Sequence, residues 1–226
     1  ENNYYTLIKK EIAQVHQNYQ IDINTQAAFS KKFYKNIFNN GQSIINSPGL
    51  KTLKNKLKGA HGAVMTGIRE SKSEFVLVIP ADDNYNTLNL MEMYNVLKND
   101  EIDVLCPDRF IEPGSIVNGP FVKFLIVRLV NYSLYYLANV QTKDGTNGFR
   151  FFSRRVIDNI KIESNTGFTY SLEYLLKSIE KGYKIGRFPA KWIERKKGQS
   201  RFKILKWSFD YLYWYFYAFK IKIFKK

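Results

Sequence analysis

The chain has 226 residues, a formal net charge of +15 and an aromatic content of 16%, with 16 tyrosines and 17 phenylalanines. This length suits one α/β domain with a core of its own, and the charge indicates an anionic partner such as nucleic acid, an acidic membrane face or a phosphate-bearing substrate. A single cysteine, Cys106, excludes an internal disulfide and a thiol cluster for zinc, and two histidines exclude a histidine-rich metal site.

Helical and extended patterns alternate along the chain. Its first half is predicted to contain, in order, a helix over residues 3–15, a strand over 19–23, a helix over 26–39, a strand over 43–46, a helix over 58–71, a strand over 74–79, a helix over 87–99 and a strand over 102–106. After Pro120 the pattern predicts a helix over 121–138, a turn at 143–145, a strand over 148–152, a helix over 171–181 and a strand over 185–192. This alternation predicts an α/β fold with a mostly parallel central sheet and helices on both faces.

Two adjacent carboxylates, Asp82 and Asp83, follow the apolar run 75–79. A buried strand that ends on acidic residues places them at the carboxyl edge of the sheet, where open α/β folds bind ligands. Carboxylates fixed there suit a hard divalent cation, which in turn holds a diphosphate. The plainer interpretation is an acidic N-cap for the helix that follows.

The aromatic and basic C-terminal segment, residues 201–226, is predicted to be an amphipathic helix on a membrane surface. Tyr and Trp prefer the headgroup layer, and the flanking lysines are attracted to anionic lipid. The alternative is a helix that packs on the core through Leu205, Phe209, Leu212 and Phe216. Neither this segment nor residues 121–140 is expected to span a membrane, because charged residues interrupt both and a span needs about 20 mostly apolar residues.

Five short segments of the chain together form a specific pattern. They are residues 59–68 (GAHGAVMTGI), 81–83 (ADD), 108–109 with 114–115 (DR and GS), 144–150 (DGTNGFR) and 188–201, which begins with FPA and ends with ERKKGQSR. In this order they resemble the family 2 glycosyltransferases of GT-A (Rossmann-like) fold, and most closely the polyprenyl-phosphate (dolichyl-phosphate) mannose and glucose synthases. The resemblance implies a GT-A glycosyltransferase domain over residues 1–200, followed by the helix over 201–226.

The resemblance also implies a bound Mg2+ or Mn2+ at the acidic pair. Asp82 matches the second aspartate of the family's Asp-x-Asp motif, Asn84 matches an additional ligand, and Asp83 is an extra carboxylate. Pro80 stands where the first aspartate belongs, and a proline side chain cannot ligate a metal. The expected metal ligands are therefore Asp82, Asp83 and Asn84. Asp82 is expected to be catalytic because the cation neutralises the leaving diphosphate.

The resemblance further implies that basic residues bind the phosphate of a lipid acceptor. Guanidinium groups suit this role because they bind phosphate through paired contacts. The candidate substrate-binding residues are Arg109, Lys123, Arg128, Arg150, Arg195, Ser200 and Arg201. Lys123 replaces a family arginine, and Val127 replaces a family serine. The alternatives are solvated surface charges, snorkelling of Lys123 and Arg128 beside a membrane, and an ion pair between Arg150 and Asp144 that fixes the turn.

A general base is missing from residues 166–173, which offer only Glu173 in an apolar helical pattern. A phosphate oxyanion is already a nucleophile at pH 7, so the absence favours a polyprenyl phosphate over a sugar hydroxyl as the acceptor. Asp144 remains a candidate base, and with Arg150 and Asp82 it forms the expected catalytic set. Its alternative role is to cap the turn before Gly145.

The N-terminal part departs from the family pattern. The usual first strand and the Asp-Asp-Gly-Ser segment that binds the nucleotide have no counterpart, and residues 19–24 stand in place of the second. The chain opens on Glu1 and not on Met, so a trimmed N-terminus without a signal peptide is expected. The expected contacts to the nucleotide are Asp22, Gly59, Asp82 and Asp83.

The expected function is transfer of a hexose from a nucleotide-diphosphate sugar to a polyprenyl phosphate, by a metal-dependent inverting enzyme. Its expected place is the cytoplasmic face of the membrane, as a peripheral protein on an anionic surface. One alternative is transfer to a surface-polysaccharide or lipid-linked sugar acceptor, and another is a degenerate GT-A scaffold without catalysis. Nucleic-acid binding is not expected, because the aromatic residues lie in apolar helices and are not interleaved with arginine on a strand face.

Overall fold

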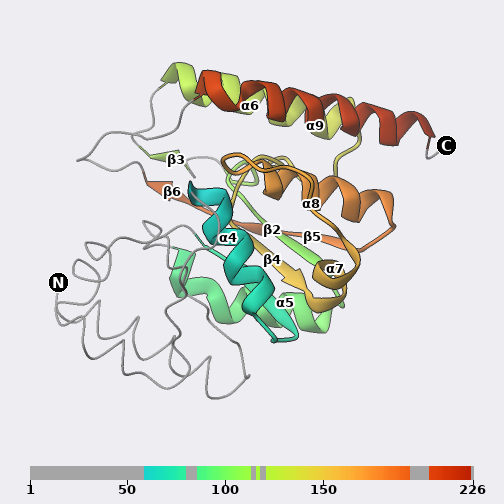
Figure 1. Cartoon of the computed structure of the whole chain (residues 1–226). Coiled ribbons are helices and arrows are strands. Elements are labelled where there is room, and N and C mark those ends of the chain that lie inside the picture. Colours follow the sequence, from blue (N-terminus) through green and yellow to red (C-terminus); the bar gives the residue numbers. More distant parts are fainter. Residues whose placement is uncertain (1–58, 80–85, 113–115, 118–120, 194–203, 225–226) are drawn as a thin grey trace.

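The computed structural model describes residues 59–79, 86–112, 116–117, 121–193 and 204–224, which form an α/β arrangement of a central sheet with helices on both faces (Figure 1). The helices predicted over 3–15 and 26–39 and the strands predicted over 19–23 and 43–46 lie outside the described residues. The remaining predicted elements fall on described segments and can be compared directly.

The central sheet has four strands in the order β1-β4-β2-β5. These strands are β1 (Phe75–Val78), β2 (Val104–Asp108), β4 (Arg150–Ser153) and β5 (Ile185–Pro189). Strand β4 is antiparallel to both β1 and β2, and β2 pairs in parallel with β5, so β1, β2 and β5 run in one direction and β4 runs in the other. The prediction of a mostly parallel sheet is thus confirmed in part, because the described sheet is mixed, with the one reversed strand β4. The reason is that the chain returns to the carboxyl end of β2 before it enters β4, so β4 runs backwards between β1 and β2.

Pro107 limits the pairing between β2 and β4. The register of these two strands joins Val104 to Phe152 and Leu105 to Phe151, and it includes no pair at Pro107. Proline lacks the N–H that a ladder needs. The Pro107 carbonyl instead accepts a hydrogen bond from Asn147 Nδ2 at 2.9 Å. The turn before β4 is thereby attached to the end of β2.

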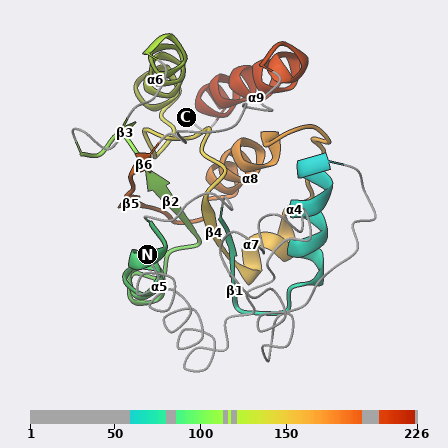
Figure 2. The ribbon, with the colours of Figure 1, turned by 90° about the vertical axis from the view of Figure 1, so that its left-hand side faces the viewer.

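Helices cover both faces of the sheet (Figure 2). On one face lie α4 (Gly59–Glu70), α7 (Arg154–Asn159) and α8 (Thr169–Glu180), and on the other lies α5 (Leu90–Asn99) after the short helix η1 (Asn86–Asn89). Successive strand residues supply the two cores, because side chains alternate across a strand. Val104 and Phe152 pack with the first group of helices, whereas Leu105 and Phe151 pack with α5.

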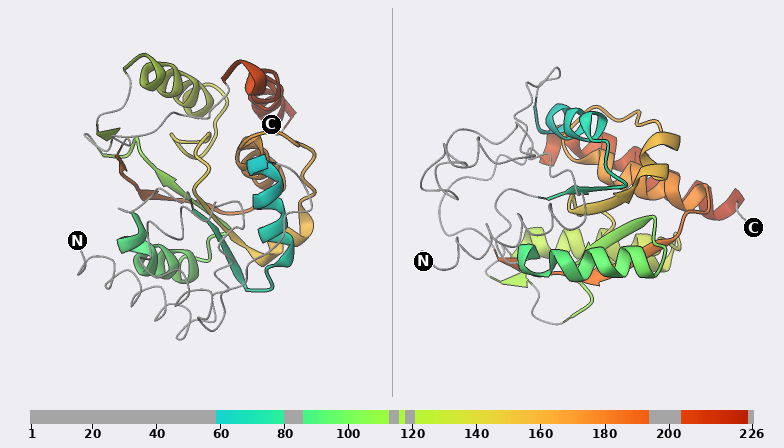
Figure 3. Two further views of the ribbon diagram at one scale, coloured as in Figure 1. Left: turned by 60° about the vertical axis from the view of Figure 1, so that its left-hand side comes forward. Right: turned by 90° about the horizontal axis from the view of Figure 1, so that it is seen from below.

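Two long helices form a further layer outside α8. These are α6 (Phe121–Tyr136) and α9 (Ile204–Phe224), and Figure 3 shows them on the side of the sheet away from α5. The Ser133 and Tyr215 hydroxyls are 2.9 Å apart and join the two helices. Tyr217 donates to Glu180 at 2.7 Å and joins α9 to α8. Of the helices in the described part of the chain, none is long and apolar enough to cross a membrane.

Most of the predicted elements are confirmed, with ends displaced by a few residues. Helix α7 and the short strand β3 (Ile116–Val117) were not predicted. The strand predicted over 185–192 divides into β5 and β6 (Trp192–Ile193), and β6 pairs in parallel with β3 in a separate two-stranded sheet. The predicted C-terminal helix is confirmed as α9.

Candidate active site

The candidate site lies where the carboxyl ends of β1, β2 and β5 meet the amino end of β4. The register places Val78 opposite Arg150 and Asp108 opposite Pro189, so these strand ends share one edge of the sheet. Three of the predicted site residues, Arg109, Asp144 and Arg150, come together at this edge. They belong to the end of β2, the turn before β4 and the start of β4.

Asp144 holds Arg109 in a bidentate ion pair. Arg109 Nε lies 2.6 Å from Asp144 Oδ2, Nη2 lies 2.7 Å from Oδ1, and the Arg109 backbone N–H donates to Oδ2 at 3.1 Å. The Asp144 side chain is fully buried, and the Arg109 guanidinium lies 5.4 Å from the centre of the Trp192 ring. Burial alone would lower the pKa of Arg109, but the Asp144 carboxylate outweighs it and raises that pKa. Arg109 is therefore a fixed cation.

Asp108 organises the same strand end but was not among the predicted site residues. Its Oδ2 accepts hydrogen bonds from Thr142 Oγ1 at 3.0 Å and Arg187 Nε at 2.9 Å, and its Oδ1 accepts the Phe110 N–H at 2.8 Å. The residue is fully buried. The signal that could have found it is the one that drew attention to Asp82, a carboxylate directly after an apolar strand.

Arg150 is a fully buried cation, and its guanidinium N–H groups are only partly engaged by described residues. Its Nη2 donates to the carbonyl oxygens of Asp144 and Gly145, both at 2.9 Å, while Nε and Nη1 are buried and have no partner among the described residues. Arg150 therefore fixes the turn through backbone carbonyls and not through the Asp144 carboxylate. Beside it, burial raises the pKa of the Cys106 thiol to about 11, so Cys106 is a neutral core residue.

The charged side chains gathered at this sheet edge, here called the positive cluster, carry an excess of positive charge. Three guanidinium groups, those of Arg109, Arg150 and Arg187, face two carboxylates, those of Asp108 and Asp144. Buried charges are costly unless they are paired, so a guanidinium that forms no ion pair with a described residue favours an anionic ligand. Phosphate oxygens suit Arg150 Nε and Nη1, for which the described part of the chain offers no acceptor.

Glu173, the only acid in the segment examined for a general base, has a structural role. It is fully buried, and its carboxylate accepts the backbone N–H groups of Glu163 and Ser164 at 2.7 and 2.8 Å. Lys177 donates to the same carboxylate at 2.7 Å. Glu173 thus holds the loop before α8 and does not face the cluster.

The other predicted site residues are spread more widely. Arg128 is exposed on α6, and its guanidinium lies 5.0 Å from the centre of the Tyr132 ring. Lys123 belongs to α6, and Gly59 begins α4 with a φ of +86°, a conformation that glycine adopts without strain. The predicted residues outside the described part of the chain are Asp22, Asp82, Asp83, Asn84, Arg195, Ser200 and Arg201. Among the described residues, no group of three His, Cys, Asp or Glu side chains could hold a metal ion.

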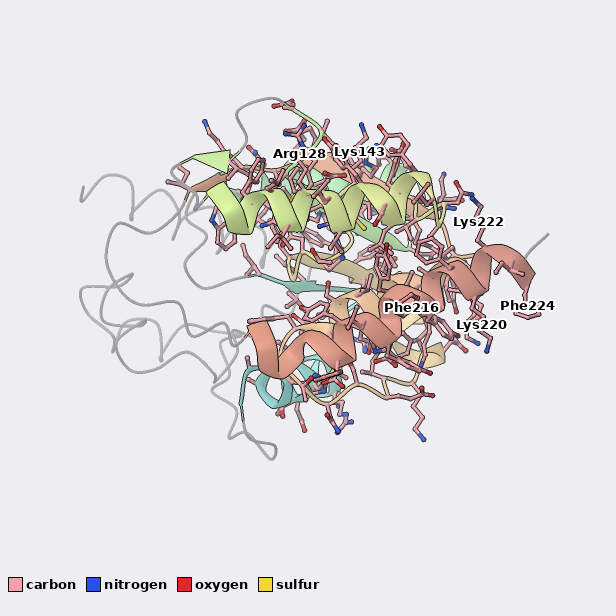
Figure 4. All side chains as sticks on the ribbon, turned by 90° about the horizontal axis from the view of Figure 1, so that it is seen from above. Arg128, Lys143, Phe216, Lys220, Lys222 and Phe224 are labelled. Atoms are coloured by element: carbon pink, nitrogen blue, oxygen red, sulfur yellow. The ribbon has the colours of Figure 1, made fainter. Side chains whose placement is uncertain are left out.

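Helices α6 and α9, with Leu137 directly after α6, expose many large apolar side chains, which are together called the apolar face. Its members are Leu125, Ile126, Leu129, Tyr136, Leu137, Phe209, Leu212, Tyr213, Phe216, Ile223 and Phe224. Figure 4 views both helices from this side, with Phe216 and Phe224 on α9 and the cations Arg128, Lys143, Lys220 and Lys222 near the two helices.

The apolar face overturns the alternative packing predicted for the C-terminal helix. Phe209 is 79% exposed and Phe216 is 65% exposed, whereas Trp214, Ala218 and Ile221 are buried against the core. Helix α9 therefore packs through the opposite side from the one predicted. Large apolar side chains that gather on an exposed surface are typical of a binding surface.

Comparisons with known proteins all find enzymes that transfer sugars. The model of Glycosyl transferase family 2 matches residues 30–161, more than half of the chain. The dolichol-phosphate mannosyltransferase of Pyrococcus furiosus is 26% identical over 161 residues, which are 70% of this chain and 44% of that protein. The polyprenol monophosphomannose synthase of Mycolicibacterium smegmatis is 22% identical over 118 residues, which are 47% of this chain and 44% of that protein. The chain thus spans less than half the length of these curated relatives.

Proposed function

The chain belongs to glycosyltransferase family 2, and we propose that it transfers a hexose from a nucleotide-diphosphate sugar to a polyprenyl phosphate. The two relatives named above are a dolichol-phosphate mannosyltransferase and a polyprenol monophosphomannose synthase, and their names support this acceptor class. The proposed domain organisation is a GT-A domain over residues 1–200 with a C-terminal helix over 201–226.

The observation that carries the proposal is the positive cluster at the sheet edge. Arg150 keeps two buried donors without a partner among the described residues, and Arg109 is held in one orientation by Asp144. A phosphate monoester offers several anionic oxygens to such donors. We place the acceptor phosphate at this edge, with further contacts from Lys123, Arg128, Arg195, Ser200 and Arg201.

The proposed donor half of the site includes Mg2+ or Mn2+. Asp82, Asp83 and Asn84 offer two carboxylates and an amide oxygen, which are the hard oxygen ligands that these cations prefer. When bound, the cation offsets the charge of the departing diphosphate. Asp22 and Gly59 are the proposed further contacts to the nucleotide.

The proposed reaction needs no base among the residues of this chain. An oxygen of the acceptor phosphate attacks the anomeric carbon, the bond from that carbon to the diphosphate oxygen breaks, and the configuration inverts. The phosphate is already an anion near pH 7, so no proton must be removed from it. Asp144, predicted to be catalytic, is then proposed to act by holding Arg109, since both of its carboxylate oxygens are engaged.

A lipid-borne acceptor requires contact with a membrane. We propose that the apolar face lies in the interfacial layer of the cytoplasmic leaflet, with Lys220 and Lys222 near the headgroups. Apolar side chains next to cations are the features that bind an amphipathic helix to anionic lipid. The net charge of +15 is consistent with such a surface.

Two measurements on the full chain test the proposal. Calorimetry with GDP-mannose and UDP-glucose, with and without Mg2+, should show metal-dependent binding that Asp82→Ala abolishes. Transfer of labelled hexose should occur to polyprenyl phosphate in anionic vesicles and not to free saccharides. Turnover with saccharides alone would favour the polysaccharide alternative, and a wild type without metal-dependent donor binding would be a scaffold.

A further inference from the structure

Asn131 is a fully buried amide on a helix whose outer side is apolar and exposed. Its exposure is 0%, whereas Ile126 and Leu129 on the same helix are 57% and 61% exposed. Leu134, one turn further along, is also fully buried. Because side chains three positions apart share one face of a helix, Asn131 and Leu134 mark the inner face of α6. A polar side chain on that buried face needs hydrogen-bond partners.

Three hydrogen bonds engage the Asn131 amide. Its Oδ1 accepts the Thr146 backbone N–H at 3.1 Å, and its Nδ2 donates to the Thr146 hydroxyl at 2.9 Å and to the Val127 carbonyl at 2.8 Å. A Cβ added to Gly145 would lie 3.6 Å from Asn131 Oδ1, so the turn rests directly on α6. Asn131 therefore holds Thr146 by both its backbone and its side chain.

Thr146 lies between the two parts of the positive cluster. On one side of it, Asp144 holds Arg109. Arg150, on the other side, donates to the carbonyl oxygens of Asp144 and Gly145. A displacement of Thr146 therefore moves the Asp144 carboxylate, which holds Arg109. It also moves the carbonyl groups that hold Arg150.

We propose that Asn131 is a positioning residue that links the lipid-facing helix α6 to the turn 144–148 and thereby sets the orientation of Arg109. This inference rests on the proposed transfer to a lipid-borne phosphate. Helix α6 is joined to α9 through Ser133 and Tyr215, so the link to the turn comes from the two-helix layer that carries the apolar face. Contact of that layer with lipid then steadies the residues that receive the acceptor phosphate.

Steady-state kinetics separate this role from a general loss of structure. Asn131→Leu keeps the side-chain size but removes both bonds to Thr146, and we expect the acceptor KM to rise about tenfold while the donor KM stays unchanged. The matched control is Asn159→Ala. Asn159, exposed at the end of α7, donates through Nδ2 to the Arg155 carbonyl four residues earlier, the same local bond that Asn131 makes to Val127. This control should leave both KM values unchanged. Thr146→Ser, which keeps the hydroxyl, should retain wild-type kinetics.

Amide hydrogen exchange at Thr146 supplies a readout that needs no catalysis. Loss of the Oδ1 acceptor should speed exchange of the Thr146 N–H about tenfold in Asn131→Leu. Vesicles of phosphatidylglycerol should slow this exchange in the wild type and leave it unchanged in the variant. Where Asn131→Leu does not fold, Thr146→Val removes only the bond between the amide and the hydroxyl, and a smaller rise of about threefold in acceptor KM is expected.

The outcomes distinguish this inference from the proposed function. If the wild type transfers hexose to polyprenyl phosphate but Asn131→Leu leaves the acceptor KM and the Thr146 exchange unchanged, the positioning role is overturned and the function stands. If vesicles bind without slowing the Thr146 exchange, the link to lipid is likewise overturned. If the exchange behaves as expected but no transfer occurs, the proposed function fails and the positioning of the turn by Asn131 stands.

Discussion

Asp144 engages Arg109 through both of its carboxylate oxygens and also accepts the Arg109 backbone N–H. Both oxygens of this carboxylate are thus occupied by donors of Arg109. The bidentate geometry fixes the plane of the guanidinium, whose central carbon lies 5.4 Å from the centre of the Trp192 ring. We therefore expect Asp144 to act by positioning Arg109.

Asp144→Asn tests this role, because it keeps the shape of the side chain and removes its charge. If Asp144 positions Arg109, the acceptor KM should rise about tenfold with a smaller change in kcat. If Asp144 were a general base, kcat would fall by about 10²–10⁴ at unchanged acceptor KM. Asp158→Asn is the control, since Asp158 is exposed and forms a 3.7 Å ion pair with Arg154 on α7.

Arg150→Met removes the buried cation while filling much of its volume. We expect transfer to fall by about 10², because the acceptor phosphate loses a charge-assisted partner in a buried site. The free energy of unfolding should fall by only about 1–3 kcal/mol, since two carbonyl oxygens lose their donor. Both quantities are measured on the same preparation, by hexose transfer and by urea unfolding.

Arg154→Met is the matched control for Arg150→Met. Arg154 Nε donates to the Ser73 carbonyl at 2.9 Å and Nη2 to Ser71 Oγ at 3.2 Å, at the far end of the sheet from the cluster. A similar loss of stability with full activity is expected. Equal losses of activity in the two variants would contradict a phosphate-binding role for Arg150.

The helices and strands in the described part of the chain were largely predictable because their signals are local. Apolar residues three or four positions apart mark α8, and the apolar run 75–79 marks β1. The direction of β4 was not predictable in this way. It depends on where the turn 144–148 returns the chain, and Asn147 and Asn131 fix that return through contacts with Pro107 and Thr146.

The residues that belong to the site were more predictable than the ion pairs that they form with one another. Arg109, Asp144 and Arg150 were all expected at the site, but the one ion pair considered from the sequence was an alternative that joined Asp144 to Arg150, six positions apart. The observed ion pair joins Asp144 to Arg109, 35 positions earlier. Only the arrangement of β2 beside the turn brings these two side chains together.

The buried side of α9 was not predictable because aromatic residues occupy every side of this helix. Phe216 and Trp214 are equally apolar in sequence, yet Phe216 is exposed and Trp214 is buried. Periodicity selects a face only when the other faces are polar. Contacts of Tyr215 with Ser133 and of Tyr217 with Glu180 set the rotation of the helix.

Phe216→Ser tests the apolar face. Burial of one phenylalanine in an apolar layer contributes about 1.5–3 kcal/mol, so binding to phosphatidylglycerol vesicles should weaken about tenfold or more. Vesicle sedimentation measures the binding, and circular dichroism shows whether the fold is kept. Ile193→Ser is the control, because Ile193 is 47% exposed on β6, outside the apolar face, and its replacement should leave vesicle binding unchanged. Equal binding by wild type and Phe216→Ser would reject the membrane proposal for α9.

Asp103 is expected to make the fold sensitive to acid. Burial alone would raise the pKa of its carboxyl group, but hydrogen bonds from Arg155, Ser153 and the Lys184 N–H outweigh it and lower that pKa below 3.8. The folded state therefore binds a proton less readily than the unfolded chain, so the stabilisation is complete above about pH 4 and is lost as the pH falls further. Asp103→Asn should cost about 2 kcal/mol of unfolding free energy at pH 7 and much less near pH 3, as measured by urea unfolding. Asp100→Asn, which changes an exposed acid three positions earlier, should cost almost nothing at either pH. A deficit of Asp103→Asn that stays constant between these pH values would show that the charge of Asp103 does not stabilise the fold.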